Sequence, residues 1–198
     1  MLIYVEGFTI MSIKAVVKEH FSHSPISRHL NKHFLNAQEI TIKNTNWEDI
    51  NLELRRFSSD DVFQCVELFM RVFSSDPWFD NWLSFDYVND YLNELILNPV
   101  FMGFVAREDS DEIAAVCFGH KKSWWMGKEF IIDEFYVKND RQGKGIGSLL
   151  MDYMVDILSE NDYKRLILTT NRNIPAQWFY IKNGFVNNEN RVVMIKEI

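Results

Sequence analysis

The sequence predicts an α/β (α+β) protein with a mixed, mostly antiparallel central sheet of about seven strands and helices on both faces. Short apolar runs bounded by turn residues alternate with segments whose apolar residues recur at helical spacing. Their order is strand, two helices, three strands, helix, strand, helix and two strands. The chain has 198 residues, of which 47% are apolar, so it can bury one sizeable core.

The first strand and the first two helices are predicted between residues 50 and 98. Residues 52–57 have the pattern of a strand. The segment Ser59–Asp61 favours a helix start, and apolar residues at helical spacing continue over 62–73. Ser84 is expected to cap the second helix, which ends at Asn98 because the residue before a proline avoids the helical conformation.

Three strands and a long helix are predicted next. Residues 101–107 and 113–120 flank a polar turn, which indicates an antiparallel hairpin, and residues 130–137 form a third strand. A glycine-rich turn then leads into a helix over 146–158, whose acidic residues fall on one polar face.

The C-terminal part completes the predicted sheet. Leu166–Leu168 is wholly apolar, as expected of a buried central strand. Pro175 suits the first turn of a helix and Gly184 suits its C-terminal end. Two short strands, 185–186 and 192–195, are expected to close the chain, and the last would allow a homodimer by strand pairing.

Residues 1–48 lie outside this regular pattern. We therefore predict an N-terminal extension of uncertain structure over 1–48 and a single domain over 49–198. Four of the five histidines fall in the extension, namely His20, His23, His29 and His33. The first two and the last two would each share a helix face, which suits a metal ion. No cysteine or acidic ligand completes the pattern, so a solvated polar face is favoured and no metal site is predicted.

Charge and cysteine usage narrow the class of protein. The net charge of −7 disfavours nucleic acid as a partner, because phosphates are held mainly by Lys and Arg. Cys65 and Cys117 lie in apolar patterns, where a thiol behaves as a small hydrophobe. With no pattern typical of a signal peptide and no apolar run of about 18 residues, we expect a cytoplasmic protein that does not bind a membrane.

The segment Lys138–Ser148, between a predicted strand and a predicted helix, carries most of the functional argument. Glycines 143, 145 and 147 let the backbone approach a ligand closely and present several N–H groups in one direction. The helix N-terminus adds a partial positive charge, and the basic side chains of the segment outnumber Asp140. These features favour a pyrophosphate-binding turn over an ordinary connection between a strand and a helix.

The spacing of the glycines disfavours the common nucleotide motifs. The G-x-G-x-x-G pattern of dinucleotide sites fails at Ser148. The G-x-x-x-x-G-K-[ST] pattern of triphosphate sites fails because Lys144 lies inside the turn. A nucleotide-dependent oxidoreductase is therefore the least favoured alternative.

The turn resembles the R/Q-x-x-G-x-G/A signature of the GNAT superfamily of acyl-CoA-dependent N-acetyltransferases, with Gln142, Gly145 and Gly147 in the signature places. The segment Asn173–Phe185 is similar to the second signature of this superfamily, N-x-x-A-x-x-F-Y-x-x-x-G-F. The two motifs occur in the right order, and the resemblance covers residues 52–195. It implies a GNAT-like fold with acetyl-CoA as co-substrate.

The resemblance also implies which residues bind acetyl-CoA. Backbone groups of Phe135 and Val137 would hold the pantetheine arm and polarise the thioester carbonyl. The other residues implied in binding are Gln142, Gly143, Lys144, Gly145, Ile146, Gly147, Ser148 and Asn173.

Two catalytic residues are predicted. The resemblance implies that Tyr180 faces the departing thiolate and orients or protonates it, whereas ordinary packing of Phe179 and Tyr180 is the alternative. Glu134 and Asp133 are adjacent on an otherwise apolar strand, where a carboxylate needs a partner or a functional reason. Because side chains alternate along a strand, only one of them should face the acceptor, and we choose Glu134 as the base. A structural ion pair is the alternative.

The acceptor site is predicted between the first two helices, where aromatic and acidic residues interleave. Its residues are Phe73, Asp76, Trp78, Phe79, Asp80, Trp82, Phe85, Asp86, Tyr87 and Asp90. Aromatic faces and carboxylates suit a cationic amine, although core packing would explain many of the same aromatics. We therefore predict an N-acetyltransferase acting on a primary amine of a small, cationic molecule. A non-catalytic module that binds acyl-CoA and a protein N-acetyltransferase are the alternatives.

Overall fold

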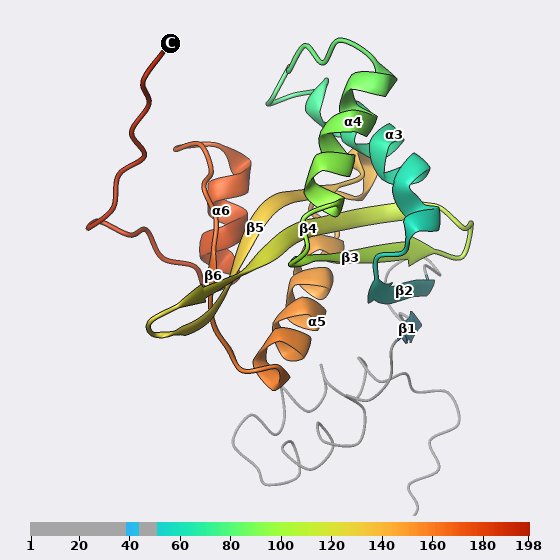
Figure 1. Cartoon of the computed structure of the whole chain (residues 1–198). Coiled ribbons are helices and arrows are strands. Elements are labelled where there is room, and N and C mark those ends of the chain that lie inside the picture. Colours follow the sequence, from blue (N-terminus) through green and yellow to red (C-terminus); the bar gives the residue numbers. More distant parts are fainter. Residues whose placement is uncertain (1–38, 44–50) are drawn as a thin grey trace, which may run out of the picture. The chain divides into compact units, whose positions relative to one another are not determined.

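The computed structural model describes residues 39–43 and 51–198 (Figure 1). The chain divides into two compact units, the first ending at Leu168 and the second comprising Thr169–Ile198. The elements of unit 1 are β1 (Glu39–Lys43), β2 (Asn51–Arg56), η1 (Ser59–Asp61), α3 (Val62–Phe73), α4 (Phe85–Ile96), β3 (Phe101–Glu108), β4 (Ile113–Trp124), β5 (Gly127–Val137), η2 (Asn139–Arg141), α5 (Ile146–Glu160) and β6 (Tyr163–Ile167). Unit 2 contains α6 (Pro175–Lys182). The predicted histidine pairs at 20/23 and 29/33 lie outside the described residues.

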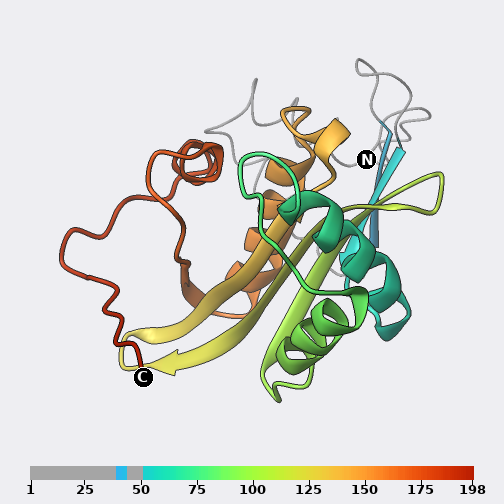
Figure 2. The same ribbon diagram turned by 90° about the horizontal axis from the view of Figure 1, so that it is seen from above.

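Unit 1 is built on one open sheet with the strand order β1-β2-β3-β4-β5-β6. Neighbouring strands from β1 to β5 are antiparallel, and β5 and β6 are parallel. The predicted mixed, mostly antiparallel sheet is therefore confirmed. The strands β4 and β5 form a long hairpin, and Figure 2 shows them running side by side. β1 lies within the segment 1–48 and pairs with β2.

The prediction of about seven strands was wrong, because the described residues form a sheet of six. The segments 185–186 and 192–195 form no strand. A strand is stabilised by hydrogen bonds with a neighbouring strand, and the one regular element within unit 2 is a helix. Residues 192–195 are 70–88% exposed, so the strand on which the predicted homodimer depended is not formed.

The prediction of a central strand at Leu166–Leu168 was also wrong. β6 is the last strand in the order of the sheet, and its ladder joins it to β5. Leu166, Ile167 and Leu168 are half-buried as a result. A wholly apolar run suits a strand covered on both faces, but it does not determine where in the sheet the strand lies.

The sheet has helices on both faces, as predicted. α3 and α4 cover one face and α5 covers the other (Figures 1 and 2). On the first face, Phe118 of β4 belongs to one buried cluster with Phe69 of α3 and Leu92 of α4. On the second face, the ring of Phe104 contacts the ring of Tyr153 in α5, with centroids 6.3 Å apart. This division follows from the alternation of side chains along each strand.

The helix starts follow from capping chemistry. The hydroxyl of Ser84 accepts a hydrogen bond from the Tyr87 amide at 3.2 Å, so α4 begins at Phe85 as predicted. The first helical segment begins with the short helix η1, whose N-cap is Ser58. The Ser58 hydroxyl and the Asp61 carboxylate form a reciprocal capping box there.

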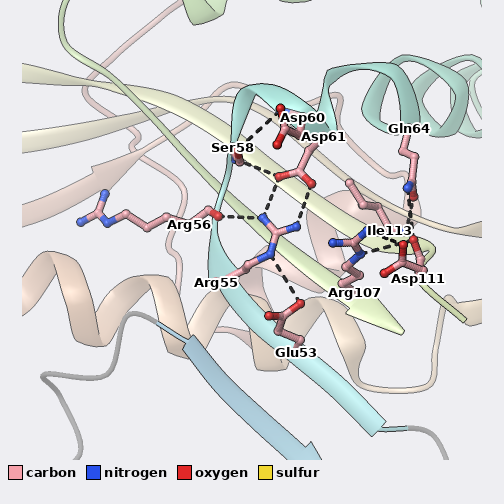
Figure 3. A network of polar contacts seen from close by, with 10 residues as sticks. All are labelled: Glu53, Arg55, Arg56, Ser58, Asp60, Asp61, Gln64, Arg107, Asp111 and Ile113. Carbon is pink, nitrogen blue, oxygen red and sulfur yellow. Dashed lines mark hydrogen bonds and ion pairs between the residues drawn. The ribbon is translucent and has the colours of Figure 1, made fainter. Parts of the chain in front are cut away.

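A polar network joins β2, the start of α3 and the β3–β4 turn (Figure 3). Both terminal nitrogens of Arg55 donate to Asp61 at 2.7 Å. Burial acts to raise the pKa of Asp61, but the hydrogen bonds from Arg55 and the Ser58 amide outweigh it, so this pKa is lowered. Gln64 donates to the Asp111 carbonyl at 3.1 Å and accepts from the Ile113 amide at 2.9 Å, which ties α3 to the turn.

Both cysteines are buried free thiols, as predicted. Burial raises the pKa of Cys65 and of Cys117, because a thiolate is poorly solvated in the core. Within the described ranges, no helix is long and apolar enough to cross a lipid bilayer.

Candidate active site

β5 carries a β-bulge beside its two adjacent carboxylates. Glu134 pairs with Phe118 of β4 and Ile132 pairs with Gly119, so Asp133 is the extra residue of the bulge. A bulge interrupts the alternation of side chains and increases the local twist of the strand. The choice of Glu134 over Asp133 rested on regular alternation, and the bulge interrupts that alternation between these two residues.

Both carboxylates act on Tyr91 of α4. The Tyr91 hydroxyl donates a hydrogen bond to Oε1 of Glu134. Burial raises the pKa of Tyr91, and the charges of Glu134 and Asp133 raise it further. Tyr91 is therefore a protonated hydrogen-bond donor at neutral pH.

Glu134 has the properties of a general base. Burial raises its pKa from 4.5 to about 7, the hydrogen bond from Tyr91 lowers it, and the charges of Asp133 and Asp80 raise it. A carboxyl with a pKa near the working pH can both accept and release a proton. Its hydrogen-bond partner is a neutral phenol rather than the Lys or Arg of a structural ion pair.

Asp133 has a partner that the sequence analysis missed. Its Oδ2 lies 2.7 Å from Nδ1 of His120, and the two side chains are 23% and 29% exposed, respectively. His120 lies on β4, where it pairs with Ile131 of β5. The sequence analysis predicted 113–120 and 130–137 as consecutive strands but did not predict that they pair, and it is this pairing that brings His120 close to Asp133.

The predicted acceptor aromatics divide into two groups. Four rings are half-buried and pack against the buried cluster of α3, α4 and the sheet, so core packing accounts for them. They are the rings of Phe73, Trp78, Trp82 and Phe85. Phe79 and Tyr87 are exposed by 69% and 54%. Trp82 lies beside Tyr91, with ring centroids 5.3 Å apart, and its buried Nε1 has no hydrogen-bond partner among the described residues.

The predicted acidic residues of the acceptor region are exposed, and one of them is coupled to the site. These residues are Asp76, Asp80, Asp86 and Asp90. Asp80 is the one whose charge raises the pKa of Glu134. Its amide donates to the Phe73 carbonyl at 2.8 Å, which holds the start of this loop against the end of α3.

The glycine-rich turn has the backbone geometry that the sequence predicts for close approach of a ligand. Gly143 and Gly145 have φ angles of 72° and 84°, in the left-handed region, and a Cβ at either position would meet nothing within 4 Å. Gly145 is the N-cap of α5 and supplies no side-chain hydrogen bond to it. The first N–H groups of α5 have no intrahelical acceptor, which suits an anion.

Several side chains of the turn form ion pairs or hydrogen bonds with other residues of the protein. Lys138 pairs with Glu112, and Arg141 pairs with Glu108. Gln142 donates from Nε2 to the Val137 carbonyl at 3.0 Å, so its side chain holds the turn against the end of β5. The residues Gln142, Gly143, Lys144 and Gly145 are exposed, whereas Ile146 and Gly147 are buried and Ser148 is half-buried.

The end of β5 extends past its ladder with β6. The parallel pairing covers Lys128–Ile131 of β5 and ends with Ile131 beside Ile167. Phe135 and Val137, which the sequence analysis assigned to the pantetheine arm, lie on β5 beyond this ladder and before the turn. Unit 1 therefore brings together the end of β5 and the glycine-rich turn, with Glu134 between the ladder and the turn.

Unit 2 carries the second predicted motif. Tyr180 lies in α6, and its ring contacts those of Phe179 and Phe185 with centroids 5.2 Å and 5.4 Å away. Asn173 has a φ of 64°, and its amide donates to Oε1 of Gln177 at 2.7 Å. These contacts give Tyr180 and Asn173 local structural roles within unit 2.

Among the described residues, no group of three or more His, Cys, Asp or Glu side chains is arranged to hold a metal ion.

The chain belongs to the acetyltransferase (GNAT) family, whose family model matches residues 64–185. This match includes most of α3, the bulge of β5, the glycine-rich turn and α6. The resemblance noted in the sequence is thereby confirmed, and with it the assignment of the chain to a family of acyltransferases. No curated protein gives a significant match to the sequence.

Solved structures share this fold. A possible acetyltransferase from Clostridium difficile 630 has a TM-score of 0.63 and 18% identity, over 74% of this chain and 98% of that one. An aminoglycoside acetyltransferase from an uncultured soil metagenomic sample, solved with trehalose, has a TM-score of 0.58 and 18% identity, over 74% and 96%. A ribosomal-protein-alanine N-acetyltransferase from Brucella melitensis has a TM-score of 0.61 and 16% identity, over 74% and 99%. At these identities the likeness establishes the fold.

Proposed function

We propose that this chain is an N-acetyltransferase that moves an acetyl group from acetyl-CoA to a primary amine of a small, cationic molecule by direct transfer. The observation that carries the proposal is Glu134, a half-buried carboxyl with a pKa of about 7 that is coupled to Asp133 and Asp80. Three acidic side chains at one site attract an ammonium group. The ring of Tyr91, whose hydroxyl donates to Glu134, suits the same cation.

The glycine-rich turn fits the pyrophosphate of acetyl-CoA. Open space at the Cβ positions of Gly143 and Gly145 permits close approach, and α5 begins without a side-chain cap. We assign the backbone of residues 143–148 to the pyrophosphate, Phe135 and Val137 to the pantetheine arm, and Asn173 to a further contact. Bound acetyl-CoA supplies a thioester carbonyl that an amine nitrogen can attack, so that a C–N bond forms as the C–S bond breaks.

Glu134 and Tyr180 are assigned to the proton transfers. An ammonium must lose a proton before the electron pair on its nitrogen can attack, and Glu134 accepts that proton. Tyr91 keeps the Glu134 carboxylate oriented by donating to Oε1. The Tyr180 hydroxyl is assigned to the departing sulfur, which it orients or protonates.

Thermal unfolding in the presence of acetyl-CoA tests the binding step. A ligand at a hundred times its dissociation constant adds about 2.7 kcal/mol to the free energy of unfolding. We expect stabilisation by acetyl-CoA and none by NADH or ATP. Gly145→Glu should abolish the effect, whereas Ser110→Glu, which adds the same charge at an exposed turn, should not.

Release of the CoA thiol with a panel of amines then tests transfer. We expect turnover with small polycations, such as aminoglycosides and polyamines. Turnover with peptide N-termini alone would favour a protein N-acetyltransferase, and binding without any turnover would favour a sensing module. Equal stabilisation by NADH, or none by acetyl-CoA, would refute the proposal.

A further inference from the structure

We propose that His120, held by Asp133, is a proton-relay residue that carries the acceptor's proton from Glu134 to solvent. The inference rests on the proposed acetyl transfer. It gives a role to His120, which the proposed transfer has not yet used, and a second role to Asp133.

The contact with Asp133 determines how the imidazole is oriented. Nδ1 of His120 lies 2.7 Å from Oδ2 of Asp133. When Asp133 is a carboxylate it can only accept hydrogen bonds; Nδ1 is then the donor, and in the neutral ring Nε2 carries the electron pair. The contact therefore prepares Nε2 to take up a proton, and Asp133 stabilises the imidazolium that results.

The strand register places His120 on the same face of the sheet as Glu134. Glu134 is paired with Phe118, and His120 lies two residues further along β4 from Phe118. Diagonal neighbours in a regular antiparallel pair have Cα atoms on the order of 7–8 Å apart, and here the extra residue Asp133 lies between the two positions on β5. One water molecule and two side chains can bridge a separation of that order. His120 is 29% exposed, so the imidazole can exchange a proton with solvent.

The charges around the pair favour a transient cation. The charged groups that act on Glu134 and on its partner Tyr91 are the carboxyl groups of Asp80, Glu94 and Asp133. Asp133 is also in direct contact with the imidazole, so its negative charge attracts an imidazolium. On β4 itself, Lys122 comes next on this face, and its ammonium lies over the Trp124 ring, 4.4 Å from the centroid.

The proposed relay moves one proton in three steps, from the ammonium to Glu134, then to His120 and then to solvent. An N–H bond of the ammonium breaks, its electron pair stays on nitrogen, and the proton binds the Glu134 carboxylate. That O–H bond then breaks and the proton passes to Nε2 of His120, directly or through one water molecule. Bulk water or buffer base removes it from the imidazolium, which restores both side chains for the next turnover. Without the relay, the proton would leave from the half-buried Glu134 alone.

Chemical rescue distinguishes a relay from a structural role. With the full-length protein and its best amine, His120→Ala should lower kcat by about 10²-fold, the lower end of what a positioned proton acceptor contributes. The KM for acetyl-CoA should be unchanged. Added imidazole should restore part of the lost kcat in a concentration-dependent manner. Lys121→Ala, on the neighbouring residue of β4, should keep the wild-type rate with or without imidazole.

A second variant distinguishes loss of the proton acceptor from misfolding. His120→Asn keeps an N–H donor for Asp133 and has no basic nitrogen, so it should retain the thermal midpoint and still lose kcat. Wild-type rates in both variants would overturn the relay, and so would a loss that imidazole does not restore. If the wild-type protein itself binds acetyl-CoA but acetylates no amine, the proposed function fails first and the relay fails with it.

Discussion

Replacing Glu134 with Gln should make the protein more stable and less active. The variant keeps the shape of the side chain and an oxygen that can accept from Tyr91, but it cannot ionise. Burial raises the pKa of Glu134 from 4.5 to about 7. Each pKa unit corresponds to about 1.4 kcal/mol, so ionised Glu134 destabilises the folded state by at most about 3 kcal/mol. Glu134→Gln removes this cost.

Because folding raises the pKa of Glu134, the stability difference between the wild type and Glu134→Gln depends on pH. A carboxyl whose pKa is raised on folding binds its proton more tightly in the folded state than in the unfolded state. Its contribution to stability is therefore fully present below pH 4.5 and is lost as the pH rises through about 7. The gain from Glu134→Gln should be near zero at pH 4.5 and approach about 3 kcal/mol at pH 8.

Urea denaturation of the two proteins, followed by circular dichroism at several pH values, measures this difference. Each titration gives a free energy of unfolding, and the other ionisable groups cancel in the comparison. The same preparations should show that Glu134→Gln lowers kcat by a factor of about 10² or more. A stability difference that is independent of pH, or a less stable variant at pH 8, would refute the assigned pKa and its cause.

Three further predictions concern the surroundings of the site and the fold. Tyr91→Phe removes the hydrogen bond that lowers the pKa of Glu134, so the acidic limb of the pH–rate profile should move above about 7. Gly145→Ala should cost about 1–2 kcal/mol in urea denaturation, because φ is 84° and no side chain crowds the position; an unchanged stability would contradict this strain. Asp61→Asn should cost about 3 kcal/mol at pH 7, since it leaves the Arg55 charge poorly paired. As the pKa of Asp61 is lowered on folding, that difference should shrink as the pH falls below 3.8, which acid titration of both proteins can check.

Local chemistry explains why most of the fold could be predicted. Ser84 caps α4, Pro175 begins α6 and Gly184 follows its end with a φ of 87°, each at the position that the sequence indicated. The hairpin of β3 and β4 likewise follows from two apolar runs around a polar turn. These features depend on residues close together in the chain, so they can be predicted from one sequence.

The errors concern contacts between distant segments. The apolar run 192–195 has the composition of a strand, but a strand also needs a neighbour to pair with, and composition does not supply one. The bulge at Asp133 depends on how β5 matches β4, so alternation along β5 alone could not predict it. The contact of His120 with Asp133 depends on the same register between β4 and β5, which the sequence analysis did not predict.

The candidate site likewise combines features that depend on neighbouring residues with features that depend on contacts between distant segments. The sequence predicted that glycines 143, 145 and 147 permit close approach of a ligand, and two of them, Gly143 and Gly145, adopt the left-handed φ that glycine allows. The side chain of Gln142 instead reaches back to the Val137 carbonyl, a contact that depends on the path of the whole turn. The pKa of Glu134 depends on burial and on Asp80, which is far away in the sequence.

The two thiols in the core have a practical consequence for enzymology. Cys65 and Cys117 are the only cysteines of the chain, both are buried, and burial raises the pKa of each. Thiolates are the species that react with disulfide reagents, so the folded enzyme should consume almost none. A colorimetric assay of released CoA would therefore have a flat baseline even at high enzyme concentration. A cysteine introduced at an exposed position would likewise be the one labelled site, which suits the chain to spin or fluorophore probes without prior removal of its own thiols.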